Sequence, residues 1–500
     1  MEVMGLFIPH IYNGEAISLS SVPVVQVKPF RLAVIAHVAA GDLISAMFAQ
    51  PLGDGFRLYA VLCAPLREQL GIIATDVADS YPALTPDCPA ANGFEREIFE
   101  QWGIRPEGHP WLKPIRFQPS RMTGQTPAVG ITEFFSMEGG ESHEVAVGPV
   151  HAGVIEPGHF RFLCHGETVF HLEISLGYQH RGIERALAGG PGGRTIHYME
   201  TLAGDTTVGH AAAYCAVMEA LSGIQVPPVA NSIRAIAAEL ERMANHIGDL
   251  GALAGDVGFL PTLNYCGRIR GDVLNLTAML CGNRFGRTLL TPGGVRFGID
   301  PDRRQRLLTR LDAVEKDLDT ALSLMFSAPS VLARLERTGT LSMDLARQIG
   351  LVGVAARACG LSHDVRTGLP YGAYRFDSPP ASTFHSGDCF ARAYVRKLEV
   401  EQSIAFIRRQ LNAPSAQNEL RKPLLPLGPD RVTVALTEGW RGDICHVAAT
   451  DHEGRFAFYK VVDPSFHNWL GLAFALRGQQ ISDFPLCNKS FNLSYCGHDL

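Results

Sequence analysis

The sequence predicts a small α/β domain followed by a longer, mainly α-helical domain with small β elements. Strand-like and helical patterns alternate over residues 1–117, whereas long apolar stripes at helical spacing dominate residues 145–500. Between them, residues 118–144 are rich in Pro, Gly, Ser and Thr with little periodicity, which is typical of a linker. With 500 residues, 46% of them hydrophobic, the chain is long enough for two or three substantial cores.

The N-terminal elements are predicted from short apolar runs. Residues 31–38 and 56–63 are rich in aliphatic side chains and are expected to form strands. The segment 41–49 between them is expected to be helical, and residues 92–102 have the pattern of a short amphipathic helix. Together these runs predict an α/β arrangement.

The C-terminal helices are predicted from side-chain spacing. Residues 231–250 place aliphatic side chains three and four positions apart, which gives one apolar stripe. Asp300 followed by Pro301 is typical of a helix start, with a capping residue and a proline in the first turn. A third long helix is expected over residues 388–411.

A β-hairpin is expected near the end of the chain. Residues 442–450 and 456–462 have strand character, and the turn 451–454 lies between them. The strand-like surroundings of His165 and His171 indicate structural roles for those two side chains.

Composition and charge exclude several classes of function. The formal net charge is −6 and Lys and Arg are scattered, so nucleic acid is not an expected partner. No apolar run is long enough to span a bilayer, and the first residues lack the pattern of a secretory signal. We therefore expect a cytoplasmic protein whose attachment to a membrane, if any, is peripheral.

The eleven cysteines are widely separated, and the sequence contains no Cys-x-x-Cys pair. A thiolate clamp on one soft metal ion uses two such closely spaced sulfurs. Scattered cysteines without an export signal are expected to be reduced and mostly buried.

Motifs throughout the chain resemble subunits of respiratory complex I. The N-terminal motifs at 82–86, 94–98 and 108–112 resemble the 30 kDa subunit. The later motifs resemble the 49 kDa subunit and its relatives, the large subunits of membrane-bound, energy-converting nickel–iron hydrogenases. These later motifs lie at 148–151, 157–161, 180–184, 239–242, 292–295, 357–360 and 463–466.

The fused order, 30 kDa-like then 49 kDa-like, looks most like the large subunit of hydrogenase-4 and of formate hydrogenlyase. The resemblance implies a nickel–iron hydrogenase large-subunit fold for residues 145–500. It also implies partners: a small iron–sulfur subunit similar to the 20 kDa subunit of complex I, and membrane proton-channel and antiporter-like subunits. The chain would then lie on the inner face of the cytoplasmic membrane, with the iron–sulfur cluster in a partner.

The resemblance fails at the family's metal ligands. The nickel–iron site of these hydrogenases needs two Cys-x-x-Cys pairs. In this chain Ala203 and Thr206 occupy the two cysteine positions of the first pair. The second pair is replaced by Ser494 and Gly497, with Cys496 between them. One thiol cannot replace four, and hydroxyl oxygens are too hard for low-spin nickel and iron. We therefore expect no nickel–iron centre and no other cofactor held by this chain.

The resemblance to complex I also implies a quinone as the electron acceptor. In complex I a His and a Tyr hold the quinone headgroup, and the register places Pro157 and Gly204 at those positions. His159 and Tyr214 lie nearby in the sequence, although an aligned helix would turn Tyr214 elsewhere. Quinone binding therefore stays open as an expectation.

Glu184 matches a glutamate that relays protons in the hydrogenase relatives. Desolvation raises the pKa of a partly buried carboxyl group toward neutrality, which suits that role. The alternative is a salt bridge from Glu184 to Arg181 or Arg185. Two other carboxylates, Glu95 and Glu97, are expected at a contact with another subunit.

Four further residues are candidates for proton transfer or for lining the cavity. His180 and His210 are suited to proton movement because imidazole titrates near neutral pH, and the alternative is a hydrogen-bonded core histidine for each. Asp364 and Arg366 match a loop beside the active cavity in both relative families, and their alternative is an ion pair that fixes the loop.

The leading hypothesis is a cofactor-free subunit of a membrane-associated, complex I-like or hydrogenase-4-like oxidoreductase. It would pass electrons to a quinone or another small acceptor, or transmit conformational change, in a complex that translocates ions. One alternative is a nickel–iron hydrogenase with unusual ligands that include Cys496 and Cys215. A second is a structural adaptor that docks a soluble dehydrogenase onto ion-pumping subunits.

Overall fold

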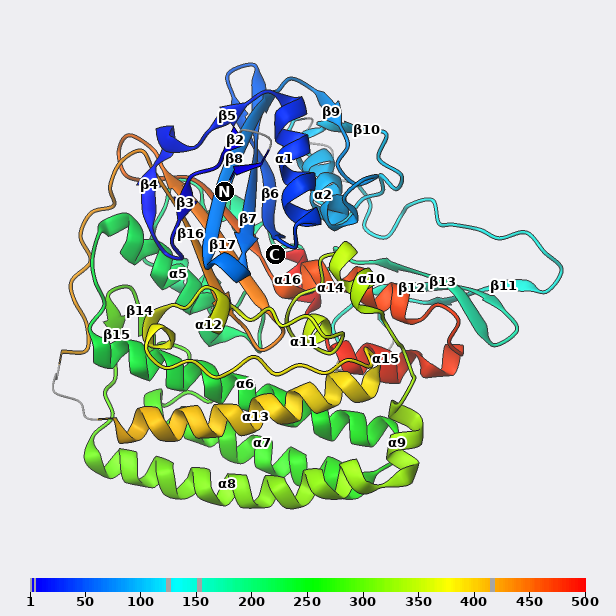
Figure 1. The fold of residues 1–500 in the computed structure, drawn as a ribbon, viewed down its shortest axis with the longest axis vertical. Coiled ribbons are helices and arrows are strands. Elements are labelled where there is room, and N and C mark those ends of the chain that lie inside the picture. The colour runs from blue at the N-terminus through cyan, green and yellow to red at the C-terminus, as the bar shows by residue number, and fades with distance from the viewer. Residues whose placement is uncertain (1, 4–5, 123–126, 151–154, 414–418) are drawn as a thin grey trace.

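A computed structural model describes residues 2–3, 6–122, 127–150, 155–413 and 419–500. Figure 1 shows the N-terminal strands and helices above a layer of long helices, with a narrow sheet that projects to one side. His151, in the motif at 148–151, lies outside the described residues. Within the described ranges, none of the helices combines the length and the apolar character needed to cross a bilayer.

A five-stranded sheet forms the centre of the N-terminal part, with strand order β3-β8-β7-β6 and β5 beside β8. Helices α1 and α2 pack against it. Its elements are β3 (His10–Ile11), β5 (Val24–Val25), α1 (Val27–Ala39), β6 (Leu43–Leu52), β7 (Gly55–Ala64), β8 (Gln69–Val77) and α2 (Asn92–Trp102). The predicted strand at 56–63 and helix at 92–102 are confirmed.

Two predictions in this part are wrong. Residues 31–38 belong to helix α1, and most of 41–49 belongs to strand β6. In α1 the buried side chains Phe30, Val34 and His37 recur at helical spacing, which the run of aliphatic residues concealed. Strand β6 is buried on both faces over most of its length, so its sequence lacks the polar–apolar alternation of a half-exposed strand.

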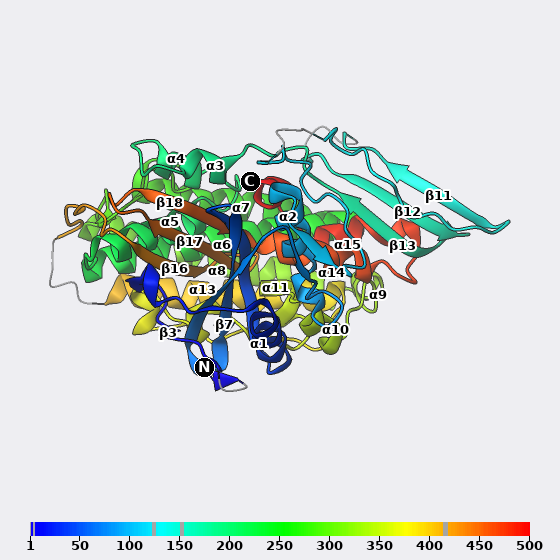
Figure 2. The same ribbon diagram turned by 90° about the horizontal axis from the view of Figure 1, so that it is seen from above.

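A second sheet joins the two ends of the chain. Its order is β18-β17-β16-β4, and its strands are β4 (Ala16–Ser18), β16 (Arg431–Glu438), β17 (Asp443–Thr450) and β18 (Phe456–Val462). The predicted hairpin is confirmed as the antiparallel pair β17–β18. This sheet contacts helix α5 (Thr207–Ser222) through β16 and β17 and strand β6 through β17 and β18. Figure 2 shows α5 beside β16–β18. Phe48, Tyr59 and Phe458 pack ring against ring across the junction of the two sheets.

Four long helices form the layer at the bottom of Figure 1: α6 (Pro228–Asp256), α7 (Leu260–Cys281), α8 (Pro301–Ser327) and α13 (Cys389–Asn412). The three predicted long helices are thus confirmed. The carboxylate of Asp300 accepts a hydrogen bond from the backbone N–H of Arg303, as expected of a capping residue.

The projecting sheet consists of β11 (Ser142–Val147), β12 (His159–His165) and β13 (Thr168–Ser175). Between 118 and 141 the described residues form no helix or strand. The domain boundaries at 117 and 145 stay a prediction, because the core that contains Phe48 and Phe458 crosses them.

The C-terminal part also contains shorter helices and strands. They are α3 (Ile183–Leu187), α4 (Thr195–Met199), β14 (Leu290–Thr291), β15 (Gly294–Val295), α9 (Pro329–Leu335), α10 (Met343–Gln348), α11 (Gly353–Arg357), α12 (Val365–Gly368), α14 (Pro464–Ala475), α15 (Phe484–Phe491) and α16 (Tyr495–Asp499).

Candidate functional site

The two segments that lack the expected sulfurs lie at the beginnings of helices. Ala203 and Thr206 belong to the turn before α5, and Ser494 and Gly497 belong to the first turn of α16. The side chains of Ala203, Thr206 and Ser494 are at most 2% exposed. The hydroxyl of Ser494 accepts a 2.9 Å hydrogen bond from the backbone N–H of Gly497, so it caps α16.

Arg441, in the turn between β16 and β17, ties the two segments together. Its guanidinium makes a two-pronged ion pair with Asp205, with both N–O distances 2.7 Å. It also donates a 2.5 Å hydrogen bond to the carbonyl of Asn492. Burial alone would lower the pKa of Arg441, but the Asp205 carboxylate outweighs this effect and raises it. A fixed cation therefore links the two segments that lack sulfur.

The residues present do not fit a nickel–iron centre. Neither Ala203 nor Gly497 has a donor atom, and the Ser494 hydroxyl is engaged by the backbone. A Cβ atom at Gly497 would lie 2.7 Å from the carboxylate carbon of Asp463, so no side chain fits there without displacement. Among the described residues, His, Cys, Asp and Glu side chains nowhere gather in threes in a way that suits a metal ion.

A chain of buried polar groups runs from this site into the second sheet. His210 lies 3.0 Å from Asp463 through one ring nitrogen and 3.1 Å from His446 through the other. His446 in turn lies 2.8 Å from the hydroxyl of Tyr459. Burial, together with the neighbouring His210, lowers the pKa of His446. His210 is therefore a hydrogen-bonded histidine of the core, and its role in proton transfer stays a prediction.

Glu184 pairs with a lysine that the sequence prediction did not name. The Lys460 ammonium lies 2.9 Å from Glu184 and 2.6 Å from Glu97. Arg181 instead donates to backbone carbonyls, so one of the two predicted partners of Glu184 is wrong. Burial raises the pKa of Glu184, but the charges of Lys460 and Arg116 outweigh it and lower the pKa, opposite to our expectation.

Glu95 and Glu97 face the interior of this chain, so the prediction of a subunit contact for them is wrong. Both are at most 1% exposed. Glu95 accepts hydrogen bonds from the backbone N–H groups of Leu84 and Thr85. Glu97 pairs with Lys460 of β18 and therefore joins the N-terminal helix α2 to the second sheet.

His180 lies at the edge of the same region. One of its ring nitrogens is 2.8 Å from the backbone carbonyl of Asp499. Burial lowers the pKa of His180, which keeps the ring neutral at pH 7. The carboxylate of Asp499 accepts hydrogen bonds from the backbone N–H groups of Gly177 and Gln179, so this histidine belongs to a tightly bonded loop.

Asp364 and Arg366 form the predicted ion pair, with an N–O distance of 2.6 Å. Burial raises the pKa of Asp364, but the charge of Arg366 outweighs it and holds the pKa well below its usual range. Arg366 also pairs with Glu239 at 3.0 Å, deep in the helical layer.

Sequence reasoning missed most of this buried ion network. Each of the missed side chains is at most 3% exposed, and they come from α6, α11, α13 and β16. The quoted motifs at 239–242 and 357–360 contain several of them, but nothing in a single sequence says which charges meet. The missed residues are Glu239, Arg242, His246, Arg357, Glu399 and Glu438.

Two cavities border the site. The larger, about 650 Å³, lies between α5, α6 and the β16–β17 turn. Helix α5 turns Gly209, Ala212 and Ala216 toward it, and Glu241 and Trp440 separate it from Arg441 and Asp205. Burial raises the pKa of Glu241 to about 8, although two backbone N–H groups at the start of α5 donate to its carboxylate. The volume is in the usual range for sites that bind small molecules.

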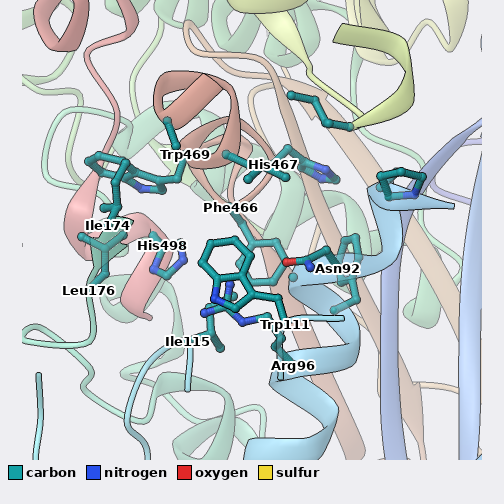
Figure 3. Close-up of a pocket in the computed structure, with 17 residues that line it drawn as sticks. Asn92, Arg96, Trp111, Ile115, Ile174, Leu176, Phe466, His467, Trp469 and His498 are labelled. Carbon is teal, nitrogen blue, oxygen red and sulfur yellow. The ribbon is translucent and has the colours of Figure 1, made fainter. Parts of the chain in front are cut away.

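The smaller cavity, about 80 Å³, lies between α2 and α14. Figure 3 shows Trp111 and Arg96 on one side and His467, Trp469 and His498 on the other. Its volume suits a few water molecules rather than an organic cofactor.

This chain is similar to subunits of respiratory-chain NADH dehydrogenase and to hydrogenases. Two family models match: the 49 kDa subunit of respiratory-chain NADH dehydrogenase over residues 256–426, and the 30 kDa subunit over residues 25–127. Carbon monoxide-induced hydrogenase of Rhodospirillum rubrum is 32% identical over 353 residues, which cover 70% of this chain and 97% of that protein. This chain belongs to the family of complex I 49 kDa subunits and hydrogenase large subunits.

Relatives that also contain the N-terminal part support the fused arrangement. Formate hydrogenlyase subunit 5 of Escherichia coli (strain K12) is 29% identical, covering 91% of this chain and 84% of that protein. Hydrogenase-4 component G of the same organism is 27% identical, covering 89% and 81%. In this chain the four positions that the resemblance assigns to cysteine carry no sulfur, and Arg441 joins the two segments that contain them.

Proposed function

We propose that this chain is a subunit of a membrane-associated, complex I-like or hydrogenase-4-like oxidoreductase and holds no nickel–iron centre of its own. Electron transfer in that complex would be coupled to ion translocation. The observation that carries the proposal is the Arg441 tie between Asp205 and Asn492, which places a guanidinium between the two sulfur-free segments. The Arg441–Asp205 ion pair and the hydrogen bond to Asn492 hold the two segments together without a metal ion.

The redox groups that this chain lacks would belong to neighbouring subunits of the complex. A small iron–sulfur subunit resembling the 20 kDa subunit of complex I would supply the cluster. Membrane proton-channel and antiporter-like subunits would hold the assembly on the inner face of the cytoplasmic membrane. Names of the relatives, such as hydrogenase-4 component G, support this kind of assembly.

The electron acceptor would be a quinone or another small molecule in the 650 Å³ cavity. Small and apolar side chains of α5, α6 and residues 371–376 line much of this cavity, and the charged side chains Glu219, Arg234, Glu241, Arg375 and Glu438 also border it. A mostly apolar lining with a few polar groups is typical of sites for small organic ligands.

Metal analysis tests the first part of the proposal. We expect the purified complex to contain background nickel and to evolve no hydrogen from a reduced donor. Stoichiometric nickel together with hydrogen evolution would establish the alternative, a hydrogenase with atypical ligands such as Cys496 and Cys215.

Quinone-dependent turnover tests the second part. Ala216→Trp fills the cavity from α5, whereas Ala313→Trp, at an exposed position of α8, is the matched control. We expect turnover to fall at least about tenfold only in the first variant, because a bulky ring excludes the acceptor. Glu184→Gln tests the proposed proton-transfer role in the same assay. Unchanged turnover in every variant of an assembled complex would favour the structural adaptor.

A further inference from the structure

Two cysteines outside the candidate site lie against each other in the interior. Cys389 is the first residue of α13, and Cys487 lies within α15. Both side chains are 0% exposed. The sulfur of Cys389 lies 3.9 Å from the backbone carbonyl oxygen of Leu486, the residue before Cys487, and each thiol shifts the pKa of the other. Neither cysteine belongs to the sulfur-free segments described above.

The surroundings make the two sulfurs chemically unequal. Arg392, one helical turn along α13, donates to the sulfur of Cys389 over 3.5 Å. Cys389 also lies at the positive end of a 24-residue helix. Burial raises the pKa of Cys389, but the hydrogen bond from Cys487 and the charge of Arg392 outweigh it and lower the pKa to about 6. The pKa of Cys487 is raised well above its ordinary value by its bond to Cys389 and by burial.

We propose that Cys389 and Cys487 are a redox-active dithiol, which hydrogen peroxide oxidises to an intramolecular disulfide. The Cys389 thiolate attacks one peroxide oxygen, the O–O bond breaks and hydroxide leaves, so Cys389 becomes a sulfenic acid. The Cys487 thiol then attacks that sulfur, the S–S bond forms, the S–O bond breaks and water leaves. In sum, the two sulfurs lose two electrons, and the peroxide is reduced to water and hydroxide.

The pair is buried, but only one backbone layer covers it. Gly339 lies directly above Cys487: a Cβ atom built on this glycine would be 2.6 Å from the sulfur. Its neighbours Arg337 and Thr340 are exposed. A local opening of this short segment would admit a molecule as small as peroxide, whereas the rest of the pair's surroundings is packed core.

The disulfide would connect elements that matter to the site. Helix α15 leads directly into Asn492, whose carbonyl holds Arg441, and into Ser494. Oxidation would join this helix covalently to α13 and would remove the thiolate beside Arg392. The proposed dithiol is thus separate from the four metal-ligand positions that lack sulfur.

A second buried cysteine pair provides a matched control. Cys63 on β7 lies close enough to Cys445 on β17 for the Cys445 thiol to raise its pKa, and both are at most 1% exposed. Burial raises the pKa of both thiols, and the carboxylate of Asp443 raises them further. These two cysteines have the burial of the proposed dithiol without its neighbouring arginine.

The test is peroxide treatment of the full-length chain in its purified complex. After the reaction is quenched, free thiols are blocked with an alkylating reagent in denaturant, and the digest is analysed by mass spectrometry. We expect a disulfide-linked peptide that joins Cys389 to Cys487, formed at least about tenfold faster than any oxidation of Cys63 or Cys445. Reduced Cys389 and Cys487 at full peroxide exposure, or equal oxidation of both pairs, would overturn the proposal.

Two variants assign the chemical roles. In Cys487→Ser we expect Cys389 to stop at the sulfenic acid, which dimedone traps. In Cys389→Ser we expect no sulfenic acid at Cys487, because the attacking thiolate is absent. Should either variant fail to fold, the wild-type disulfide measurement still decides the question.

Discussion

At the residue scale, Lys460 is the side chain on which the junction between the N-terminal and C-terminal parts depends. It is 3% exposed and lies between the carboxylates of Glu97 and Glu184, which come from α2 and α3. A lysine is buried in a folded protein only when it is paired, because a lone charge in the interior is costly. The three groups therefore stabilise the fold as a unit rather than as independent salt bridges.

Lys460→Met is expected to destabilise the protein by about 3 kcal/mol, because it removes one of two buried cations from the carboxylates of Glu97 and Glu184 and leaves only Arg116 beside them. Urea unfolding of the full chain measures the change. Lys397→Met is the control: its pair with Glu401 at 2.6 Å lies at the surface, so about 0.5 kcal/mol or less is expected. Equal losses in the two variants would contradict the assigned role of Lys460.

A second prediction at this scale concerns pH. Burial lowers the pKa of His467, beside the small cavity of Figure 3, to about 4. The unfolded chain therefore binds this proton more readily between pH 6.5 and 4, so stability is lost as the pH falls through that window. This histidine alone is expected to contribute up to about 3 kcal/mol of that loss.

His467→Asn is expected to flatten the acid side of the stability profile, measured by thermal unfolding from pH 7 to pH 4. His452→Asn, at an 80% exposed side chain, serves as the control and should leave the profile unchanged. A profile in His467→Asn as steep as that of the wild type would refute the neutral, buried state of this imidazole.

At the scale of elements, the long helices were predictable and the pairings between elements were not. The stripe over residues 231–250 and the Asp300–Pro301 start each contain enough periodic or capping signal to define a helix. Strand β6 was mistaken for a helix because a strand buried on both faces has no period of two. Glu184 and Lys460 are 276 positions apart, and no local pattern records such a contact.

At the candidate site, too, the local motifs were predictable and the contacts between distant residues were not. The sequence identified the four sulfur-free positions, because the flanking residues fix the register of each motif. It did not reveal that Arg441 would meet Asp205, which is 236 positions away. Only the folded chain brings the β16–β17 turn against the start of α5, and only then does the guanidinium explain how the two segments are held without a metal.

The first turn of α16 is the subject of a prediction at the element scale. Gly497→Ala places a methyl group 2.7 Å from the Asp463 carboxylate, which also holds His210. We expect a loss of about 1–3 kcal/mol in the free energy of unfolding, because that crowded carboxylate must move. Thermal or urea unfolding provides the measurement.

Gly204→Ala is the matched control for this variant. Gly204 lies beside Ala203 in the other sulfur-free segment, and a Cβ atom there would meet nothing within 4 Å. The control should be nearly neutral. If Gly497→Ala were equally neutral, the space around Asp463 would be larger than the structure indicates.

At the scale of the whole molecule, one apolar cluster contains residues of the N-terminal part together with residues of β16–β18. Strand β4 extends the sheet of β16–β18, and Asn13 donates hydrogen bonds to the carbonyls of Leu369 and Leu436. The rings of Phe48 and Phe458 pack against each other across this junction. A division of the chain near residue 118 would therefore cut through a continuous interior.

A fragment of residues 145–500 is expected to be insoluble or molten, because β16–β18 would lose their apolar cover and Lys460 would lose Glu97. Circular dichroism in the near ultraviolet and binding of a hydrophobic dye report the loss of fixed packing. Adding residues 1–144 as a separate chain is expected to restore both signals in part. A fragment that unfolds cooperatively by itself would show that the shared core is dispensable.

The pairing of β4 with β16 also affects how the protein is made. The hydroxyl of Thr433 donates to the carbonyl of Glu15, which is 418 residues earlier. At ordinary translation speeds the first strands leave the ribosome about 20–80 s before their partners exist. During that interval α1 and α2 can pack against the first sheet, but the apolar surface of β6 that contacts β17 and β18 lacks its partner. Newly synthesised protein should consequently depend on a holding chaperone, and slower translation should lengthen that dependence.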